Sequence, residues 1–428
     1  MVLHVRAHRH AVIRVYIHTF GCKANQYDSE VLRQALEAAG AVVVDDPAAA
    51  DSAIVNSCTV THVSEAKMRG FIRRISRKNP SLASLMVVGC SATLDDGAIA
   101  SIQGVTSVIA GIDPGPVLQA LGLPSRGADQ ILRDFRRGSR AWLKIQDGCD
   151  EHCTYCATRF ARGRSRSRSP EEILEEAQVL AGTHAELVLT GVHIGCYGQD
   201  LTGRPTLSRL VIDLITKIPN IRFRLSSVEA TQLDETLMDL MVSAPDRLAP
   251  HVHAPLQSGS QRILKLMGRV WYTPDEYRER LERLAARTQF LGLGADIIVG
   301  FPGETDADFA ATRSLVEGLP FTYIHVFPYS PRPVAPAAKL GNAVRPEVTK
   351  QRSAELRTMV AAKKAAIVAA RDGSLADVVL LRRSHGRLEG LTEDYLTVFS
   401  SSDTVLPARY DAVLRYRDGT LHAKPKID

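Results

Sequence analysis

Three cysteines stand close together in the segment DGCDEHCTYC, with the spacing C-x3-C-x2-C directly after a predicted strand. Thiolate sulfurs suit iron–sulfur clusters, and three of them on a four-iron cluster leave one iron open to bind another molecule. An open iron implies reactive chemistry, whereas four protein ligands imply electron transfer. A zinc site completed by His152 and unliganded thiols are the alternatives, but structural zinc usually has four ligands in two short pairs. The predicted cluster ligands are Cys149, Cys153 and Cys156.

Three further cysteines follow apolar runs in an N-terminal block where strand-like and helix-like segments alternate. Such alternation predicts an open parallel α/β sheet. Because the carboxyl ends of parallel strands share one edge, side chains that follow them can converge in space. Taken singly, each cysteine could be a small buried core residue. Taken together, they predict one shared site formed by Cys22, Cys58 and Cys90.

The seventh cysteine, Cys196 in TGVHIGCYG, has no partner at metal-ligand spacing. We therefore assign it no ligand role and expect a spare thiol. The neighbouring His193 is interpreted as structural.

A second alternating block follows a linker rich in glycine and proline. Its six strand–helix units are too few for a closed eight-fold barrel and predict a (β/α)6 partial TIM barrel. A basic helix over 347–371 and several short strand-like runs, among them LEGLTEDYLTVF, predict a small all-β module at the end. The expected strands of the partial barrel are 142–146, 186–190, 222–228, 251–256, 295–299 and 323–328. The predicted domains are 11–125 (open parallel α/β sheet), 138–370 (partial barrel) and 371–428 (all-β).

The composition is that of an ordinary folded protein. Of 428 residues, 45% are apolar and 23% charged, which excludes a disordered chain or a coiled coil. No run approaches the roughly 18 apolar residues of a membrane-spanning helix, so we expect no membrane anchor and no signal peptide. Seven cysteines without an export signal favour a reducing compartment, which predicts a cytoplasmic protein. The net charge of +6 permits a polyanionic partner without requiring one.

Blocks along nearly the whole chain resemble the radical S-adenosylmethionine methylthiotransferases, in the domain order of that family. HTFGCKANQYDSE, AIVNSCTVTHVSEAKMRGFIRR and MVVGCSA resemble its N-terminal domain. KIQDGCDEHCTYC, ARGRSRSR, TGVHIGCYG, ADIIVGFPGETDADF and HVFPYSPRP resemble its radical domain. GLTEDYL resembles its small C-terminal TRAM domain, which implies RNA binding by the all-β module.

The resemblance implies two [4Fe-4S] clusters. The cysteines of the C-x3-C-x2-C loop would hold the first, whose open iron chelates S-adenosylmethionine and yields a 5′-deoxyadenosyl radical that removes a hydrogen from C2 of an adenine. The three spread cysteines would hold the second, which carries or donates sulfur, and a second S-adenosylmethionine would supply the methyl group. An external electron donor is implied as a partner, and we expect the enzyme to be a monomer.

Residues near the radical site are candidates for cofactor and RNA contact. Strand ends are where a barrel places its active site, so we expect S-adenosylmethionine contacts from Tyr155, Thr190, Gly191 and Glu229. Basic residues neutralise phosphates, although a charge run can also be a solvated face. Beside the radical site we expect RNA contacts from Arg159, Arg162, Arg164, Arg166 and Arg168.

The first motif, GCKANQYDSE, is closest to the GCK-x-NQYE pattern of the subgroup that modifies threonylcarbamoyladenosine. SCTVT and IQDGC favour the same subgroup. The chain departs from the family at ATRF (157–160), where two aliphatic residues and a proline are usual, and at PVAP (333–336), where a glycine and a threonine are missing. Both segments lie near the predicted substrate opening, so they bear on fine specificity.

The predicted activity is conversion of N6-threonylcarbamoyladenosine at tRNA position 37, next to the anticodon, to its 2-methylthio derivative. The same chemistry on isopentenyladenosine tRNA, or on a ribosomal-protein aspartate, is the enzymatic alternative. A non-catalytic RNA-binding protein stabilised by metal is the alternative from another class, and it predicts zinc in place of iron.

Overall fold

The structure is a computed structural model that describes residues 12–59, 62–125, 131–136, 138–384, 387–401 and 405–426. The predicted domain ends at residues 11 and 428 lie outside these ranges. The chain folds as two compact units that divide between Leu132 and Arg133. Each unit is described by itself. No helix in the described ranges is both long enough and apolar enough to cross a membrane.

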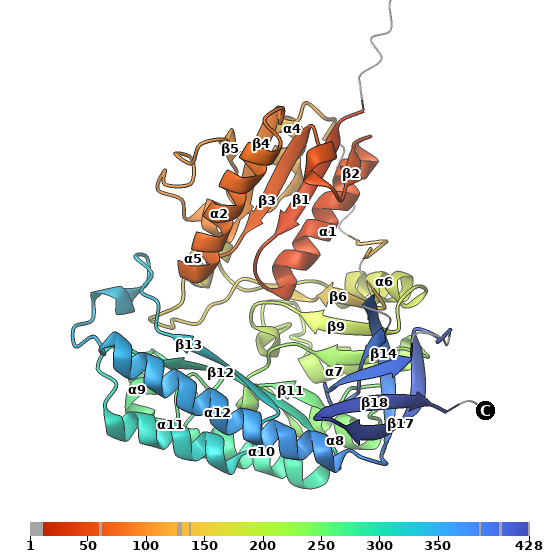
Figure 1. Ribbon diagram of the computed structural model, residues 1–428, viewed down its shortest axis with the longest axis vertical. Coiled ribbons are helices and arrows are strands. Elements are labelled where there is room, and N and C mark those ends of the chain that lie inside the picture. Colours follow the sequence, from red (N-terminus) through yellow and green to blue (C-terminus); the bar gives the residue numbers. More distant parts are fainter. Residues whose placement is uncertain are drawn as a thin grey trace, which may run out of the picture. The chain divides into compact units, whose positions relative to one another are not determined.

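Unit 1 is a parallel sheet with helices on both faces, as the sequence predicts (Figure 1). The strand order is β2-β1-β3-β4-β5, and the side chains of β3 alternate between the two layers. Ala53 and Val55 pack with α2, whereas Ile54 packs with α1 and α4. The strands are β1 (Arg14–Thr19), β2 (Val42–Val44), β3 (Ser52–Ser57), β4 (Ser84–Gly89) and β5 (Ser107–Val108), and the α-helices are α1 (Lys23–Ala38), α2 (His62–Lys78), α3 (Cys90–Thr93) and α4 (Pro114–Ala120).

Unit 2 begins with the partial barrel, and all six predicted strands are present. They form two parallel sheets, β6-β9-β10 and β11-β12-β13, which parallel bridges join at Phe223 with Leu248 and at Ser227 with His253. A small antiparallel pair, β7 (Gln146–Asp147) with β8 (Arg166–Ser167), flanks the cysteine loop. The barrel strands are β6 (Arg140–Lys144), β9 (Glu186–Thr190), β10 (Arg222–Leu225), β11 (His251–His253), β12 (Gly292–Val299) and β13 (Tyr323–Pro328).

The helices of the partial barrel begin at sequence signals that fix their first turn. Capping boxes, in which a hydroxyl and an acidic side chain satisfy each other's backbone N–H groups, start three of them, at Ser169, Thr273 and Thr305. The helices are α5 (Thr158–Arg162), α6 (Pro170–Ala181), α7 (Leu207–Lys217), α8 (Glu235–Ser243), α9 (Gln261–Leu266), α10 (Pro274–Arg287) and α11 (Asp306–Gly318), followed by the long α12 (Pro346–Ala370).

The C-terminal strands form a closed barrel in the order β14-β15-β16-β18-β17, consistent with a TRAM domain. The run 388–399, expected as one strand, is instead the end of β15 and the start of β16, because the chain turns at Thr392–Leu396 with Tyr395 at φ +68°. The strands are β14 (Leu375–Ser384), β15 (Arg387–Leu391), β16 (Thr397–Ser401), β17 (Arg409–Arg417) and β18 (Thr420–Pro425).

The turn between β15 and β16 covers the amino-terminal end of the partial barrel. There the carboxylate of Glu186 accepts hydrogen bonds from three arginines, each at the first or third residue of a barrel strand. Two of them also reach the C-terminal barrel: Arg222 donates to the carbonyl of Asp377 at 2.7 Å, and Arg224 donates to the carbonyl of Glu393 at 2.9 Å. The third is Arg140.

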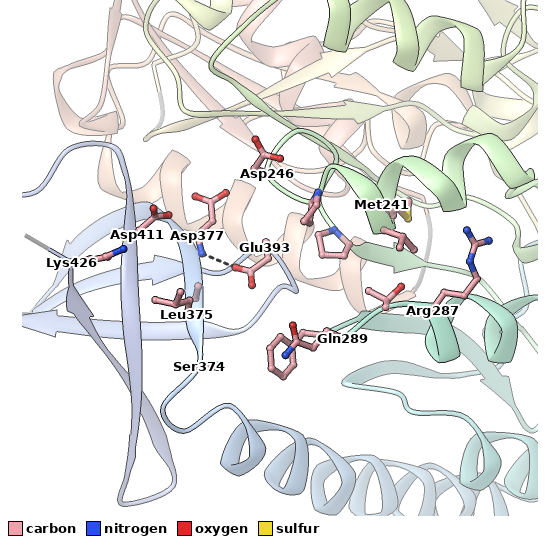
Figure 2. Close-up of a pocket in the computed structure, with 16 residues that line it drawn as sticks. Met241, Asp246, Arg287, Gln289, Ser374, Leu375, Asp377, Glu393, Asp411 and Lys426 are labelled. Atoms are coloured by element: carbon pink, nitrogen blue, oxygen red, sulfur yellow. Dashed lines mark hydrogen bonds between the residues drawn. The ribbon is translucent and has the colours of Figure 1, made fainter. Parts of the chain in front are cut away.

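A cavity of about 520 Å³ lies beside this junction, between the C-terminal barrel and the end of α8 (Figure 2). Asp377 donates its backbone N–H to Glu393 at 2.9 Å within it. None of the residues that line this cavity is one of the predicted site residues.

Candidate metal centres

The three cysteines of unit 1 lie at the carboxyl ends of adjacent strands. Cys22 follows β1, Cys58 follows β3, and Cys90 begins α3 directly after β4. The Sγ atoms of Cys22 and Cys90 both lie 3.8 Å from Oδ1 of Asn25. Cys58 Sγ lies 3.0 Å from where a Cβ would stand at Gly21, the residue before Cys22. The expected convergence at one sheet edge is therefore present.

Asn25 ties these loops together and is a residue that the sequence did not single out. Its side-chain amide donates to the carbonyls of Phe20 and Ser57, each at 2.9 Å. The amide of Asn56 in turn donates to the Asn25 carbonyl at 2.9 Å. Both asparagines are almost fully buried. The amide group thus fixes two loops while its oxygen faces the thiols.

Two glycines make room for this arrangement. Gly21 has φ +108°, and a Cβ there would stand 2.8 Å from Cys58 Cβ. Gly89 has φ +89°, and a Cβ there would overlap Oδ1 of Asn56. Other residues rarely adopt such φ angles, and either side chain would push the cysteine loops apart.

The cysteine loop of unit 2 lies between β7 and α5 and is fixed by backbone hydrogen bonds. Cys149 donates to the carbonyl of Gly163 at 3.1 Å. Thr154 donates to the carbonyl of Met267 at 2.8 Å and accepts from Ala337 at 2.8 Å. Segments that follow α5, α9 and β13 therefore hold the loop that carries the three thiols.

The thiols of this loop suit a metal cluster. Burial raises the pKa of Cys149 to about 12 and that of Cys153 to about 11, the latter against the opposing charge of Arg269. Charge repulsion from Cys156 raises both pKa values further. Thiols with such pKa values stay protonated at neutral pH unless a metal binds them. Three converging soft donors fit a four-iron cluster with one open iron.

Arg269, which the sequence analysis missed, connects this loop to a predicted cofactor residue. Its Nη2 donates to both carboxylate oxygens of Glu229, at 2.5 and 2.6 Å. Its Nη1 lies 3.7 Å from Cys153 Sγ and 3.5 Å from the hydroxyl of Tyr155. Arg269 and Glu229 are 4% and 7% exposed. Arg269 lies in the run KLMGRVW, where nothing local shows which side chain it meets.

The predicted residues at the end of β9 lie close to the same loop. Thr190 is buried at the last position of the strand. A Cβ on Gly191 would stand 2.7 Å from the Gln146 carbonyl, so only glycine allows this approach. The Oε1 atom of Gln146 accepts from the backbone N–H groups of Val192 and His193, at 3.1 and 2.9 Å. Gln146 therefore fixes the start of the loop after β9.

His193 and Cys196 lie close to the cysteine loop of unit 2, although both are distant from it in the sequence. The Nδ1 atom of His193 is 3.8 Å from Cys149 Sγ and 3.5 Å from Cys196 Sγ. Gln232 contacts Nε2 of His193 and donates to Cys196 Sγ at 3.4 Å. The imidazole thus contacts a predicted cluster ligand.

The five predicted RNA-contacting arginines divide into two groups. Arg162 pairs with Asp147 at 2.9 Å, and Arg168 pairs with Glu176 at 3.0 Å, with both guanidinium groups largely buried. Although burial raises the pKa of Asp147, the charges of Lys144 and Arg162 bring it to about 2, so this ion pair persists at neutral pH. Of the other three, Arg164 and Arg166 are exposed, whereas Arg159 is half-buried and contacts His152.

The two segments that depart from the family pattern contact or adjoin the cysteine loop. Residues 157–160 cap and begin α5, directly after Cys156. Residues 333–336 precede Ala337, whose backbone N–H binds the loop at Thr154. Both segments therefore border the cysteine loop of unit 2.

Two family descriptions match most of the chain. Residues 14–111 match the uncharacterized protein family UPF0004, and residues 143–316 match the radical SAM superfamily. Unit 1 carries the first match and unit 2 the second.

Characterised relatives cover most of the chain. The threonylcarbamoyladenosine tRNA methylthiotransferases MtaB of Bacillus subtilis and Thermotoga maritima are 36% and 37% identical to it, each over 79% of this chain and over 78% and 80% of their own. The tRNA-2-methylthio-N(6)-dimethylallyladenosine synthase of Geobacillus thermodenitrificans is 33% identical over 82% of this chain and 71% of its own.

Among solved structures, the radical S-adenosylmethionine methyltransferase TsrM from Kitasatospora setae is similar in fold. It superposes with a TM-score of 0.57 at 15% identity, over 77% of each chain. At that identity the likeness concerns the fold alone.

Proposed function

This chain belongs to the radical S-adenosylmethionine methylthiotransferases, and we propose that its substrate is N6-threonylcarbamoyladenosine at position 37 of tRNA, which it converts to the 2-methylthio derivative. The substrate assignment rests on the two threonylcarbamoyladenosine tRNA methylthiotransferases, which are 36% and 37% identical over 79% of the chain. GCKANQYDSE, around Cys22, supports the same subgroup. Isopentenyladenosine in tRNA remains the second candidate, because the dimethylallyladenosine relative is 33% identical.

Two cysteine triads would hold two [4Fe-4S] clusters. We propose that Cys149, Cys153 and Cys156 hold the radical cluster with S-adenosylmethionine, and that Cys22, Cys58 and Cys90 hold the auxiliary cluster. When bound, these groups supply hydrogen abstraction at adenine C2, the sulfur atom and the methyl group. An external reductant would supply the electrons.

The residues around the radical triad would orient the cofactor. Arg269 fixes the carboxylate of Glu229 and carries a positive charge beside Cys153, where negative charge gathers on a thiolate-bound cluster. Tyr155 packs with Met267 and Ile298 and supplies an apolar wall that excludes water. Thr190 and Gly191 complete the proposed S-adenosylmethionine contacts at the end of β9.

We propose that the RNA approaches over the arginines in and after α5 and over the C-terminal barrel. Arg159, Arg164 and Arg166 are placed for phosphate contact, whereas Arg162 and Arg168 serve mainly as internal ion-pair partners. The proposed domains are those of the sequence, 11–125, 138–370 and 371–428. We propose that the enzyme acts in the cytoplasm and is a monomer.

The test is a substrate assay with anaerobically reconstituted protein, S-adenosylmethionine and a strong reductant. Anticodon stem-loop RNAs carrying threonylcarbamoyladenosine, isopentenyladenosine or plain adenosine are digested to nucleosides and analysed by mass spectrometry. We expect methylthiolation of the first RNA only, and none with the Cys149→Ala variant. Conversion of the isopentenyl RNA, or of none of the three, would overturn the assignment.

A further inference from the structure

Three polar side chains line the inner face of the partial barrel on adjacent strands. They are His253 on β11, Asp296 on β12 and His325 on β13. On β12 the alternate residues Ala295 and Ile297 are fully buried, and Asp296 faces the opposite side of the sheet from them. Asp296 and His325 are direct partners in the register of β12 and β13. The three ligand atoms lie within 4.8 Å of one another.

A chain of hydrogen bonds connects this group to Tyr323 and His251 on the same strands. His253 Nε2 lies 3.1 Å from Asp296 Oδ1, and His253 Nδ1 lies 3.1 Å from the Tyr323 hydroxyl. That hydroxyl is 2.8 Å from Nε2 of His251, whose ring stacks on Tyr395 at 4.2 Å. In one assignment that fits these contacts, His251 donates to Tyr323, Tyr323 to His253, and His253 to Asp296.

This chain of bonds leaves Asp296 as a hydrogen-bond acceptor. Because His253 donates to one oxygen, the carboxylate has further lone pairs that it can offer to the barrel interior. The Asp296 side chain is 26% exposed, and His325 is exposed beside it. An imidazole can donate an N–H, so the wall presents an acceptor and a donor side by side.

We propose that Asp296 and His325 bind the ureido group of a carbamoylated adenosine, Asp296 accepting its N–H and His325 donating to its carbonyl. This inference rests on the proposed function and names the residues that read the substrate. A ureido group offers both an N–H donor and a carbonyl acceptor, whereas a dimethylallyl group offers no acceptor. A site built to hydrogen-bond a substrate group discriminates strongly against an analogue that lacks that group.

The test measures binding without turnover. Cluster-loaded protein with S-adenosylmethionine but no reductant is titrated into fluorescent anticodon stem-loops that differ only at position 37: threonylcarbamoyladenosine, isopentenyladenosine or adenosine. We expect Asp296→Asn and His325→Phe each to reduce the preference for the threonylcarbamoyl RNA over the adenosine RNA by about tenfold. Affinity for the adenosine RNA itself should stay unchanged. His325→Gln, which keeps an N–H donor, should retain most of the preference.

A control variant and the wild-type result distinguish failure of this inference from failure of the proposed function. Asp213→Asn, on the outer helix α7 and paired with Arg209, should leave all affinities unchanged. If wild-type protein shows no preference for the threonylcarbamoyl RNA, the proposed function itself is wrong. If wild-type protein shows the preference and both Asp296→Asn and His325→Phe retain it, the function stands and this inference is overturned.

Discussion

Arg269 donates from one nitrogen to both carboxylate oxygens of Glu229, at 2.5 and 2.6 Å, in a nearly solvent-free position. The two residues are 40 positions apart in sequence, and the arginine also lies 3.7 Å from Cys153 Sγ. A buried ion pair is costly to form but more costly to break by removing one partner. The pair therefore couples the shape of the proposed S-adenosylmethionine site to the cysteine loop.

Replacing Arg269 by methionine should leave Glu229 buried without its cation. We expect a loss of about 3–5 kcal/mol in the free energy of unfolding, together with loss of S-adenosylmethionine binding. Thermal unfolding and equilibrium dialysis measure the two effects. The double variant Glu229→Gln/Arg269→Met should recover much of the stability but not the binding. Wild-type binding by the single variant would show that Arg269 has no part in the cofactor site.

Asn25→Ala should impair the auxiliary cluster alone. The amide fixes the loops that carry Cys22 and Cys58, so we expect iron content to fall from about eight to about four per chain, with the radical cluster retained. Asn79→Ala is the matched control, because Asn79 is also a buried asparagine of unit 1 but bonds the carbonyls of Pro47 and Ala50, away from the cysteines. Equal iron loss in both variants would indicate general destabilisation of unit 1.

Glu186 should make the stability of unit 2 sensitive to acid. Burial alone would raise its pKa, but the charges of Arg140, Arg224 and Arg222 hold the pKa well below the ordinary value. A depressed folded-state pKa adds stability that is present above the unfolded-state pKa, about 4.3, and is lost as the pH falls further. We expect the melting temperature to drop below about pH 4 and Glu186→Gln to flatten that drop while lowering stability at neutral pH.

The exposed Glu282→Gln variant on α10 is the control for that acid series and should follow the wild-type curve. A Glu186→Gln protein with the same acid profile as wild type would contradict the assigned role of this carboxylate.

Replacing Arg164 and Arg166 by glutamine should weaken RNA binding through electrostatics. Each lost phosphate contact is expected to lower the slope of log affinity against log salt concentration by about 1. Fluorescence anisotropy at several salt concentrations measures this slope. Arg209→Gln, an exposed arginine on α7, should leave it unchanged. If the wild type, the Arg164/Arg166 variant and Arg209→Gln have identical slopes, these two arginines do not contact the RNA.

Apolar patterning and strand-end cysteines were enough to predict much of this architecture. β9 and β13 have the predicted bounds, 186–190 and 323–328. The helix α1 begins at Lys23, and its first turns bury polar side chains such as Asn25 and Asp28. Periodicity cannot identify a buried polar residue.

The contacts that build the radical site depend on tertiary structure and escaped prediction for that reason. Arg269 and Glu229 are separated in the sequence by α8, β11 and α9, and no local spacing signals that they meet. The Thr392–Leu396 turn has the same origin. Its residues fit the end of the partial barrel, where the carbonyls of Thr392 and Glu393 accept from Arg224.

Iron and sulfide content tests the two-cluster account most directly. Wild-type protein reconstituted without oxygen is compared with the Cys149/Cys153/Cys156→Ala and Cys22/Cys58/Cys90→Ala variants. We expect about eight irons in the wild type and about four in each variant, as two independent four-iron clusters require. Zinc in the wild type, or an iron content that neither triple variant reduces, would contradict the assignment of both cysteine triads.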